Sequence, residues 1–324
     1  MLANSYLTVR VNKSQALDVE FAGRDIISIK DFSRDEIDFV LQMTDVIEPM
    51  ARKGSRALEG KIMATLFFEP STRTRLSFES AMYRYGGQCV GFAEPKAASV
   101  EKGENLADTV RVVESYADVL VIRHPLEGAA RLAAEFASVP VINAGTGAEE
   151  HPTQAMLDLY TIRKELGRID GLNVVLAGDL RYGRTVHSLA YALSQYDINL
   201  HLVSPSLLRM RKEVLEEVSG RIKVHELEDL AQVIPEADVI YMTRIQKERF
   251  GSLEDYEKVR GSYRLMADDL VNAKPGMIVM HPLPRVDEIA YSVDGTDHAK
   301  YFKQVWYGLL VRMSLIGLVL GVLT

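Results

Sequence analysis

The stretch IMATLFFEPSTRTRLSFESAMYRYGG, residues 62–87, predicts a buried strand followed by a helix. Its first seven residues form an almost continuous apolar run, which is typical of a strand covered on both faces. Ser71 suits the N-cap of a helix over residues 71–85, and Gly86 and Gly87 suit its end. A strand followed by a helix is half of a βαβ unit, so this stretch predicts a parallel sheet.

The same alternation of short apolar runs and longer amphipathic stretches continues along the chain. Apolar runs over residues 89–92, 119–122 and 139–142 complete a first series, and runs over 174–177, 199–203, 239–242 and 277–280 form a second. Helical patterns lie between them, over residues 104–116, 127–136, 152–166, 184–195 and 205–218. We therefore predict an α/β fold of two doubly wound parallel-sheet domains joined by interdomain helices.

The length of the chain fits this division. At roughly 150 residues per domain, 324 residues suggest two domains. We expect the first domain to cover residues 1–152 and the second to cover residues 153–301. An apolar helix over residues 302–324 should complete the first domain, since its most apolar part, after Arg312, is too short to span a bilayer.

Composition excludes several classes of protein. With 38 basic and 45 acidic residues the net charge is −7, which argues against nucleic acid or an anionic membrane as the main partner. The single cysteine, Cys89, allows no intrachain disulfide and no thiolate cage, and it is compatible with a reducing compartment. The seven histidines form no metal-binding motif. We expect a cytoplasmic protein without a metal or cofactor, and the N-terminal residues give no sign of a secretory signal.

Ligands of parallel sheets bind beyond the carboxyl ends of the strands, so the residues after each strand are the candidates for chemistry. Residues 71–75, Ser-Thr-Arg-Thr-Arg, place hydroxyl groups and two arginines at the start of a helix, which suits a phosphate. The alternative is a capped helix with solvated arginines. Basic residues are unfavourable at the positive end of a helix dipole, and this favours the phosphate site.

Other candidates follow later strands, and each also has an ordinary structural explanation. Arg123 could be a surface arginine, His151 a helix cap that shares a face with Gln154, and residues 281–285, His-Pro-Leu-Pro-Arg, a rigid turn. Arg184 opens a helix, while Arg244 and Gln246 alternate after a strand. Together they predict a small, multiply anionic ligand in a cleft between the domains, with arginines pairing carboxylates in the second domain.

Residues 178–185, Gly-Asp-Leu-Arg-Tyr-Gly-Arg-Thr, almost match the spacing of a phosphate-binding P-loop. Arg184 replaces the usual lysine, and Asp179 would place a negative charge beside the phosphates. The pattern therefore argues against a nucleotide site, although an ATPase remains an alternative to be tested.

Six motifs of the chain resemble those of the aspartate carbamoyltransferase family. They are FEPSTRTRLSFESA, RHPLEGAARLA, HPTQAMLDLYTI, GDLRYGRTVHSLA, MTRIQKERF and HPLPRVDEI, and they occur in order from about Gly23 to the C-terminus. The last motif separates the family from the ornithine enzymes, which carry a cysteine where this chain has Pro282. The resemblance implies transfer of a carbamoyl group from carbamoyl phosphate to L-aspartate, an early step of de novo pyrimidine biosynthesis. It further implies a homotrimer with shared active sites and a cis peptide bond between Leu283 and Pro284, and many prokaryotic members bind a zinc-containing regulatory chain.

The resemblance also implies roles for single residues. Four residues would hold the phosphate: Ser71, Thr72, Arg73 and Thr74. Thr74, Arg123 and His151 would face the carbonyl oxygen. Gln154 and the backbone carbonyls of Pro282 and Leu283, in the turn that includes Pro284, would hold the carbamoyl NH₂. The aspartate would be bound by Arg184, Arg244 and Gln246, and the adjacent chain would contribute Ser99 and Lys102.

Some features depart from the family pattern. Residues 1–22 have no counterpart there, and the segment Gly-Thr-Gly-Ala-Glu-Glu before His151 differs from the Asp-Gly-Ser-Asn-Gln that members often carry. Lys96 is an alternative to Lys102 as the loop contact. An ornithine acceptor and a non-catalytic assembly subunit also remain alternatives.

Overall fold

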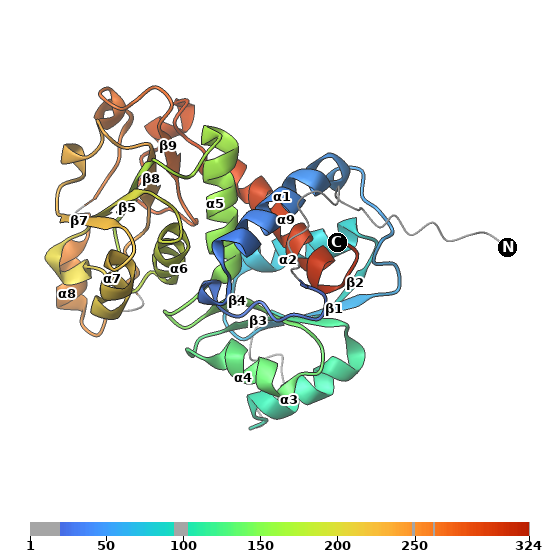
Figure 1. Cartoon of the computed structure of the whole chain (residues 1–324). Coiled ribbons are helices and arrows are strands. Elements are labelled where there is room, and N and C mark those ends of the chain that lie inside the picture. The colour runs from blue at the N-terminus through green and yellow to red at the C-terminus, as the bar shows by residue number, and fades with distance from the viewer. Residues whose placement is uncertain (1–19, 94–102, 248–249, 262, 324) are drawn as a thin grey trace. The chain divides into compact units, whose positions relative to one another are not determined.

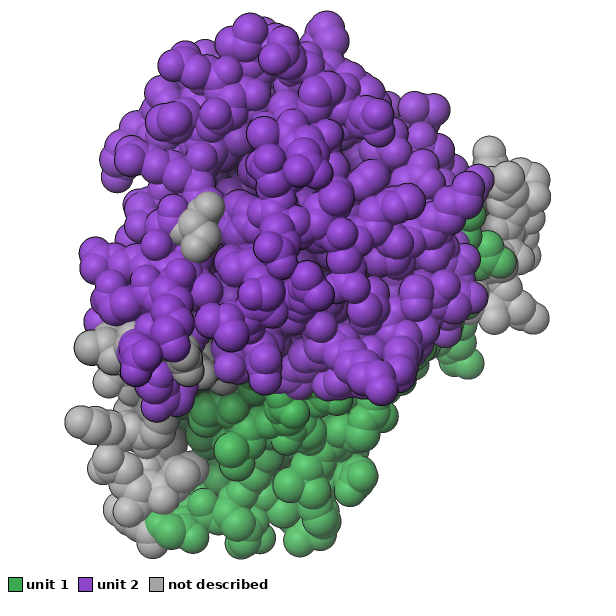
Figure 2. Space-filling view, turned by 90° about the vertical axis from the view of Figure 1, so that its left-hand side faces the viewer, with its two compact units in different colours: residues 1–156, 307–324 green, residues 157–306 purple. Residues whose placement is uncertain are grey.

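The computed structural model describes residues 20–93, 103–247, 250–261 and 263–323 of the chain (Figure 1). The chain divides into two compact units, coloured separately in Figure 2. Unit 1 comprises Met1–Met156 and Tyr307–Thr324, and unit 2 comprises Leu157–Trp306. The chain passes from unit 1 to unit 2 within helix α5 (Pro152–Leu166) and returns within helix α9 (Tyr301–Val319).

Unit 1 is built on a four-stranded parallel sheet in the order β2-β1-β3-β4. Its strands are β1 (Ile62–Phe67), β2 (Gln88–Phe92), β3 (Val119–His124) and β4 (Val141–Thr146). The N-terminal segment lengthens the sheet beside β4, where Ile26 donates to Val141 O (2.8 Å) and accepts from Asn143 N (2.8 Å). Strands β1, β3 and β4 are mostly buried, and their parallel pairing confirms the prediction of a parallel sheet from continuous apolar runs.

Helices cover both faces of this sheet. Helices α3 (Leu106–Val113) and α4 (Ala129–Phe136) lie on one face, and α1 (Arg34–Ala51), α2 (Thr72–Arg84) and α9 lie on the other (Figure 1). Val110 of α3 and Ala133 of α4 share a buried cluster with Leu66 of β1 and Ile122 of β3. The sheet is therefore a middle layer, and its carboxyl edge remains for the loops that follow each strand.

Unit 2 contains a five-stranded parallel sheet in the order β7-β6-β5-β8-β9. Its strands are β5 (Asn173–Ala177), β6 (Asn199–Val203), β7 (Lys223–Leu227), β8 (Val239–Met242) and β9 (Ile278–Met280). The helices of this unit include α6 (Arg184–Leu193), α7 (Lys212–Ser219) and α8 (Leu253–Val259). The predicted class, two doubly wound parallel sheets, is thus confirmed.

The prediction of one helix over residues 205–218 is wrong. A 3₁₀ turn, Ser206–Leu208, precedes α7, which begins only at Lys212. The Leu208 carbonyl accepts a hydrogen bond from Leu180 N (3.1 Å) in the loop after β5, so it does not take part in a continuous α-helix. Among the helices of the described residues, none combines the length and the apolar character that crossing a membrane requires.

Candidate active site

In unit 1, the predicted residues gather at the carboxyl edge of neighbouring strands. Residues 71–74 follow β1, Arg123 is the penultimate residue of β3, and His151 follows β4. The order β2-β1-β3-β4 reverses direction between β1 and β3, and such switch points are where α/β sheets bind ligands. Backbone hydrogen bonds join the carboxyl ends of these strands. Phe68 N, just after β1, donates to Arg123 O of β3 (2.8 Å), and Gly147 N, just after β4, donates to His124 O of β3 (3.0 Å).

The start of α2 has the features of an anion-binding helix terminus. Ser71 lies at the N-cap with extended backbone, as predicted, but its side chain makes no capping hydrogen bond. The backbone N–H groups of the first turn therefore donate no hydrogen bond to this side chain, which suits a bound anion. Of the two arginines of the motif, Arg75 pairs with Glu79 of its own helix (Nε–Oε1 2.7 Å), whereas Arg73 is exposed.

Arg123 is held in place by an oxygen atom of strand β4 and one of the loop after β1. Its Nη1 donates to Ala144 O (3.1 Å), and its Nε lies 3.6 Å from Glu69 Oε2. The side chain is only 11% exposed, so the guanidinium group is largely withdrawn from solvent. The next residue, His124, packs on Phe68, and burial lowers the pKa of its imidazole despite the nearby carboxylate of Glu69. Arg123 is thus the fixed cation at the end of β3.

His151 and Gln154 lie together at the start of α5, and both are buried. Gln154 N donates to His151 O (3.0 Å), which places the two residues on the first turn. The loop before them is fixed by Glu150, a buried residue that sequence reasoning did not select. Its carboxylate accepts from Ser28 Oγ (2.6 Å) and Ile29 N (3.2 Å) of the N-terminal segment.

In unit 2, Arg184 begins α6 after β5, and Arg244 and Gln246 follow β8. The strand order reverses between β5 and β8, so these side chains lie at the switch point of the second sheet. All three are partly buried. The structure therefore brings together the predicted carboxylate-binding residues of this unit at its sheet's expected ligand position.

Asp179 organises this switch point, a role that sequence reasoning missed. Its buried carboxylate accepts from Tyr182 N (2.9 Å) and Gln246 N (3.2 Å), while its own N–H donates to Thr243 Oγ1 (3.0 Å). Burial raises the pKa of Asp179, although these hydrogen bonds and the charge of Arg244 oppose the shift. Because the carboxylate occupies backbone N–H groups that a P-loop would offer to phosphate, the geometry argues against the nucleotide site.

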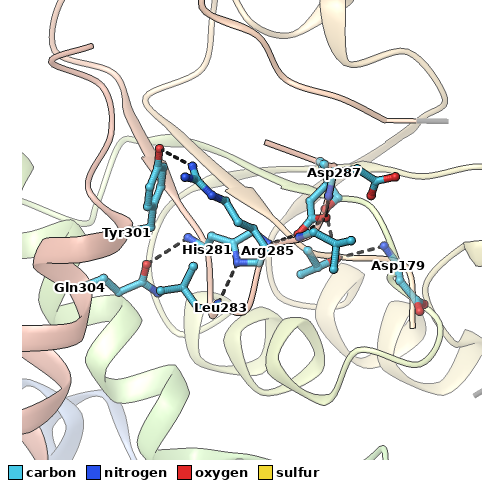
Figure 3. Close-up of polar contacts among 11 residues, drawn as sticks. Asp179, His281, Leu283, Arg285, Asp287, Tyr301 and Gln304 are labelled. Carbon is cyan, nitrogen blue, oxygen red and sulfur yellow. Dashed lines mark hydrogen bonds and ion pairs between the residues drawn. The ribbon is translucent and has the colours of Figure 1, made fainter. Parts of the chain in front are cut away.

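The turn after β9 contains the predicted cis peptide bond, Leu283-Pro284, and Leu283 has a positive φ of 54°. Figure 3 shows the side chains around this turn. Arg285 points away from it and forms an ion pair with Asp294 (Nη2–Oδ2 2.6 Å) and a hydrogen bond with Tyr301 (3.2 Å). Hydrogen bonds to Asp294 raise the pKa of Arg285. Because its guanidinium group is bonded to Asp294 and Tyr301, this arginine fixes the turn. Pro282 and Leu283 are partly exposed, and their carbonyl groups remain candidates for ligand contact.

Three predicted loop residues, Ser99, Lys102 and the alternative Lys96, lie outside the described residues. Within the described part of the chain, no three His, Cys, Asp or Glu side chains form a group that could hold a metal ion.

Comparison with known proteins assigns one family domain to each half of the chain. Residues 24–164 match the family domain described as aspartate/ornithine carbamoyltransferase, carbamoyl-P binding domain, and residues 170–319 match the Asp/Orn binding domain of the same family. The chain belongs to the aspartate/ornithine carbamoyltransferase family. Within this family, it is 60% identical to the aspartate carbamoyltransferase catalytic subunit of Thermococcus gammatolerans over 308 residues, 94% of this chain and 100% of that protein.

Solved structures of carbamoyltransferases support the same relationship. The aspartate transcarbamoylase of Trypanosoma cruzi in complex with carbamoyl phosphate and aspartate is 42% identical, with a TM-score of 0.89 over 93% of this chain and 98% of that one. The catalytic subunit of M. jannaschii aspartate transcarbamoylase is 52% identical, with a TM-score of 0.84 over 90% of this chain and 96% of that one. The aspartate branch of the family is therefore the one that this chain resembles.

Proposed function

We propose that this chain transfers the carbamoyl group of carbamoyl phosphate to the α-amine of L-aspartate, giving N-carbamoyl-L-aspartate and phosphate. The reaction is an early step of de novo pyrimidine biosynthesis. The observation that carries the proposal is the chemistry of the two switch points. In unit 1, hydroxyl groups and Arg73 stand at a helix N-terminus, which suits a phosphate; in unit 2, Arg184 and Arg244 suit the two carboxylates of aspartate.

We assign carbamoyl phosphate to the first domain, residues 1–152 completed by residues 302–324, and aspartate to the second, residues 153–301. Similarity to the T. cruzi enzyme, solved with carbamoyl phosphate and with aspartate, supports this assignment. The phosphate group is held by Ser71, Thr72, Arg73 and Thr74. The aspartate is held by Arg184, Arg244 and Gln246.

The chemistry is nucleophilic addition followed by loss of phosphate. The aspartate amine attacks the carbonyl carbon, and negative charge develops on the carbonyl oxygen. Thr74, Arg123 and His151 donate to that oxygen, while Gln154 and the carbonyls of Pro282 and Leu283, in the turn with Pro284, hold the NH₂ group. The departing phosphate accepts the amine proton, so catalysis depends on positioning and charge stabilisation.

The assembly we propose is a cytoplasmic homotrimer with shared active sites. Ser99 and Lys102 reach the site of the neighbouring chain, with Lys96 as the alternative contact. A zinc-containing regulatory chain is a further partner to test. No metal or cofactor takes part in the reaction on the catalytic chain.

The test is turnover by the purified chain with carbamoyl phosphate and either L-aspartate or L-ornithine. Carbamoylated product with aspartate alone supports the proposal, and product with ornithine alone would replace it. No product, although phosphate protects the protein against heat, would identify a non-catalytic subunit. Tight ATP binding that Arg184→Ala abolishes and Arg73→Ala does not would instead support the ATPase.

A further inference from the structure

A buried histidine connects the turn after β9 to other parts of unit 2. His281 is the first residue after β9, and its side chain is 1% exposed. Its ring makes two contacts, one with each nitrogen. Leu283 N donates to Nδ1 (2.8 Å; Figure 3). Nε2 lies 2.6 Å from Glu288 Oε1.

These contacts assign the protonation state of the ring. Nδ1 faces a backbone N–H, so it must be an acceptor and carry no proton, because two donors would otherwise face each other. Nε2 faces a carboxylate and is therefore the protonated nitrogen. His281 is neutral, with its proton on Nε2.

Glu288 keeps its charge although it is buried. Burial raises the pKa of its carboxyl group, but the hydrogen bonds that it accepts from His281 and from the backbone outweigh burial, so the pKa lies below its ordinary value. The backbone donors are Val286 N (3.1 Å) and Asp287 N (3.1 Å). One carboxylate thus holds both the histidine ring and the chain just beyond the turn.

The backbone of His281 is anchored as well. His281 N donates to Gln304 Oε1 (3.0 Å), and Gln304 Nε2 donates to Asp158 Oδ1 (2.6 Å). Gln304 and Asp158 are buried residues of α9 and α5. The histidine is therefore fixed at its backbone and at both ring nitrogens.

This arrangement sets the direction of one particular carbonyl group. The N–H of Leu283 and the C=O of Pro282 belong to the same planar peptide group and point in opposite directions. Fixing Leu283 N on the His281 ring therefore aims the Pro282 carbonyl away from the ring. Leu283 also has a positive φ of 54°, which L-residues adopt only at a cost.

We propose that His281, as the neutral tautomer protonated on Nε2, is a positioning residue that holds the Pro282 carbonyl for the substrate NH₂ group. The proposal rests on the proposed function, since it assigns that carbonyl to carbamoyl phosphate. The proposal predicts different effects on the two parts of carbamoyl phosphate, because the Pro282 carbonyl would contact the carbamoyl group and not the phosphate.

The experiment compares His281→Gln with His281→Asn in the full chain. The Gln amide can still donate to Glu288 but leaves Leu283 N without its acceptor, whereas the Asn oxygen can replace Nδ1. We expect His281→Gln to weaken carbamoyl phosphate binding about tenfold, the effect of one lost hydrogen bond. Binding of inorganic phosphate should stay within about twofold, and His281→Asn should recover most of the carbamoyl phosphate affinity.

His298→Gln is the matched control, since His298 lies in the same unit and bonds Met277 O through Nδ1 (2.8 Å) away from the turn. His298→Gln should change neither the affinity for carbamoyl phosphate nor the affinity for inorganic phosphate. Equal losses of carbamoyl phosphate and phosphate binding in His281→Gln would show general damage and overturn the proposal, as would unchanged carbamoyl phosphate binding.

Two measurements remain decisive if His281→Gln does not fold. In wild-type protein labelled with ¹⁵N-histidine, the resonance of His281 Nδ1 should be that of an unprotonated nitrogen, and protonation of both nitrogens at neutral pH would overturn the proposal. Glu288→Gln retains an oxygen acceptor for Nε2 and should weaken carbamoyl phosphate binding by less than about tenfold, with phosphate binding unchanged within about twofold. A wild-type chain that neither binds nor consumes carbamoyl phosphate would refute the proposed function, whereas the tautomer measurement is independent of it.

Discussion

At the scale of single residues, Arg123 is the side chain whose removal should be most informative. Its guanidinium group is placed by Ala144 O and Glu69, so it needs little reorganisation to meet charge that develops on a substrate oxygen. We predict that Arg123→Ala lowers kcat by roughly 10²–10³, the usual effect of one lost oxyanion donor. Steady-state assays with saturating substrates measure this.

Arg131→Ala is the control for Arg123→Ala, because Arg131 is an exposed arginine of unit 1 whose ion pair with Asp31 is long (3.5 Å). It should leave kcat unchanged. If kcat of Arg123→Ala fell by less than threefold, Arg123 would not stabilise the charge that develops on the substrate oxygen.

Asp118 provides a prediction about pH. Its carboxylate accepts from Lys61 Nζ (2.7 Å) and Ile62 N (2.9 Å) and so connects the start of β3 to that of β1. Burial raises its pKa, but these two bonds outweigh burial and hold the pKa below its ordinary value of 3.8. The unfolded chain therefore binds the proton first as pH falls, so the stability that Asp118 contributes is present above pH 3.8 and is lost below it.

We predict that Asp118→Asn lowers the free energy of unfolding by about 1 kcal/mol at pH 7 and that the difference from wild type shrinks as pH falls through and below 3.8. Equilibrium urea unfolding at several pH values measures it. Asp297→Asn, at an exposed position, should show no such dependence. A difference between Asp118→Asn and wild type that persists unchanged in acid would contradict the argument.

At the scale of elements, the ends of β5 and β8 approach so closely that only glycine fits between them. Gly178 has a φ of 112°, and a Cβ there would lie 2.3 Å from Thr243 O. We predict that Gly178→Ala costs at least about 2 kcal/mol of stability, from strain and from displacement of the β8 loop. The KM for aspartate should rise too, because Arg244 and Gln246 follow Thr243. Urea unfolding and initial rates measure the two effects.

Gly276→Ala is the matched control in the same unit, since a Cβ there meets nothing within 4 Å. It should be close to neutral. Equal stability of the two alanine variants would show that β5 and β8 can separate at this point without cost.

The elements also show what the sequence can and cannot predict. Continuous apolar runs identified the buried strands, because a strand that is covered on both faces needs apolar side chains at successive positions. Strand β7 was missed because it is an edge strand whose residues, Lys-Val-His-Glu-Leu, are largely exposed. Helix α1 was missed although Ser33 and Glu36 form a capping box that could have revealed it.

The site shows the same limit. Residues after each strand were predictable as candidates because the carboxyl edge of a parallel sheet is fixed by topology. Asp179 and Glu150 were not, because each accepts a hydrogen bond from a backbone N–H that only the fold brings near, that of Gln246 for Asp179 and that of Ile29 for Glu150. A carboxylate with that role has no sequence motif. Its partners lie up to 122 residues away, as for Glu150 and Ser28.

At the scale of the whole molecule, the proposed homotrimer predicts that two inactive variants restore each other. If His151 and Lys102 of one active site come from different chains, a trimer that mixes His151→Ala with Lys102→Ala contains one site with both residues intact. Random mixing of equal amounts should then recover about a quarter of wild-type activity, because about three quarters of the trimers are mixed and each has one intact site in three. The measurement is activity after the two variants are dissociated and reassembled together, compared with each variant reassembled alone. Trimers that form on mixing but stay inactive would show that each chain builds its active site alone, and mixing His151→Ala with Lys96→Ala in parallel distinguishes the two lysines.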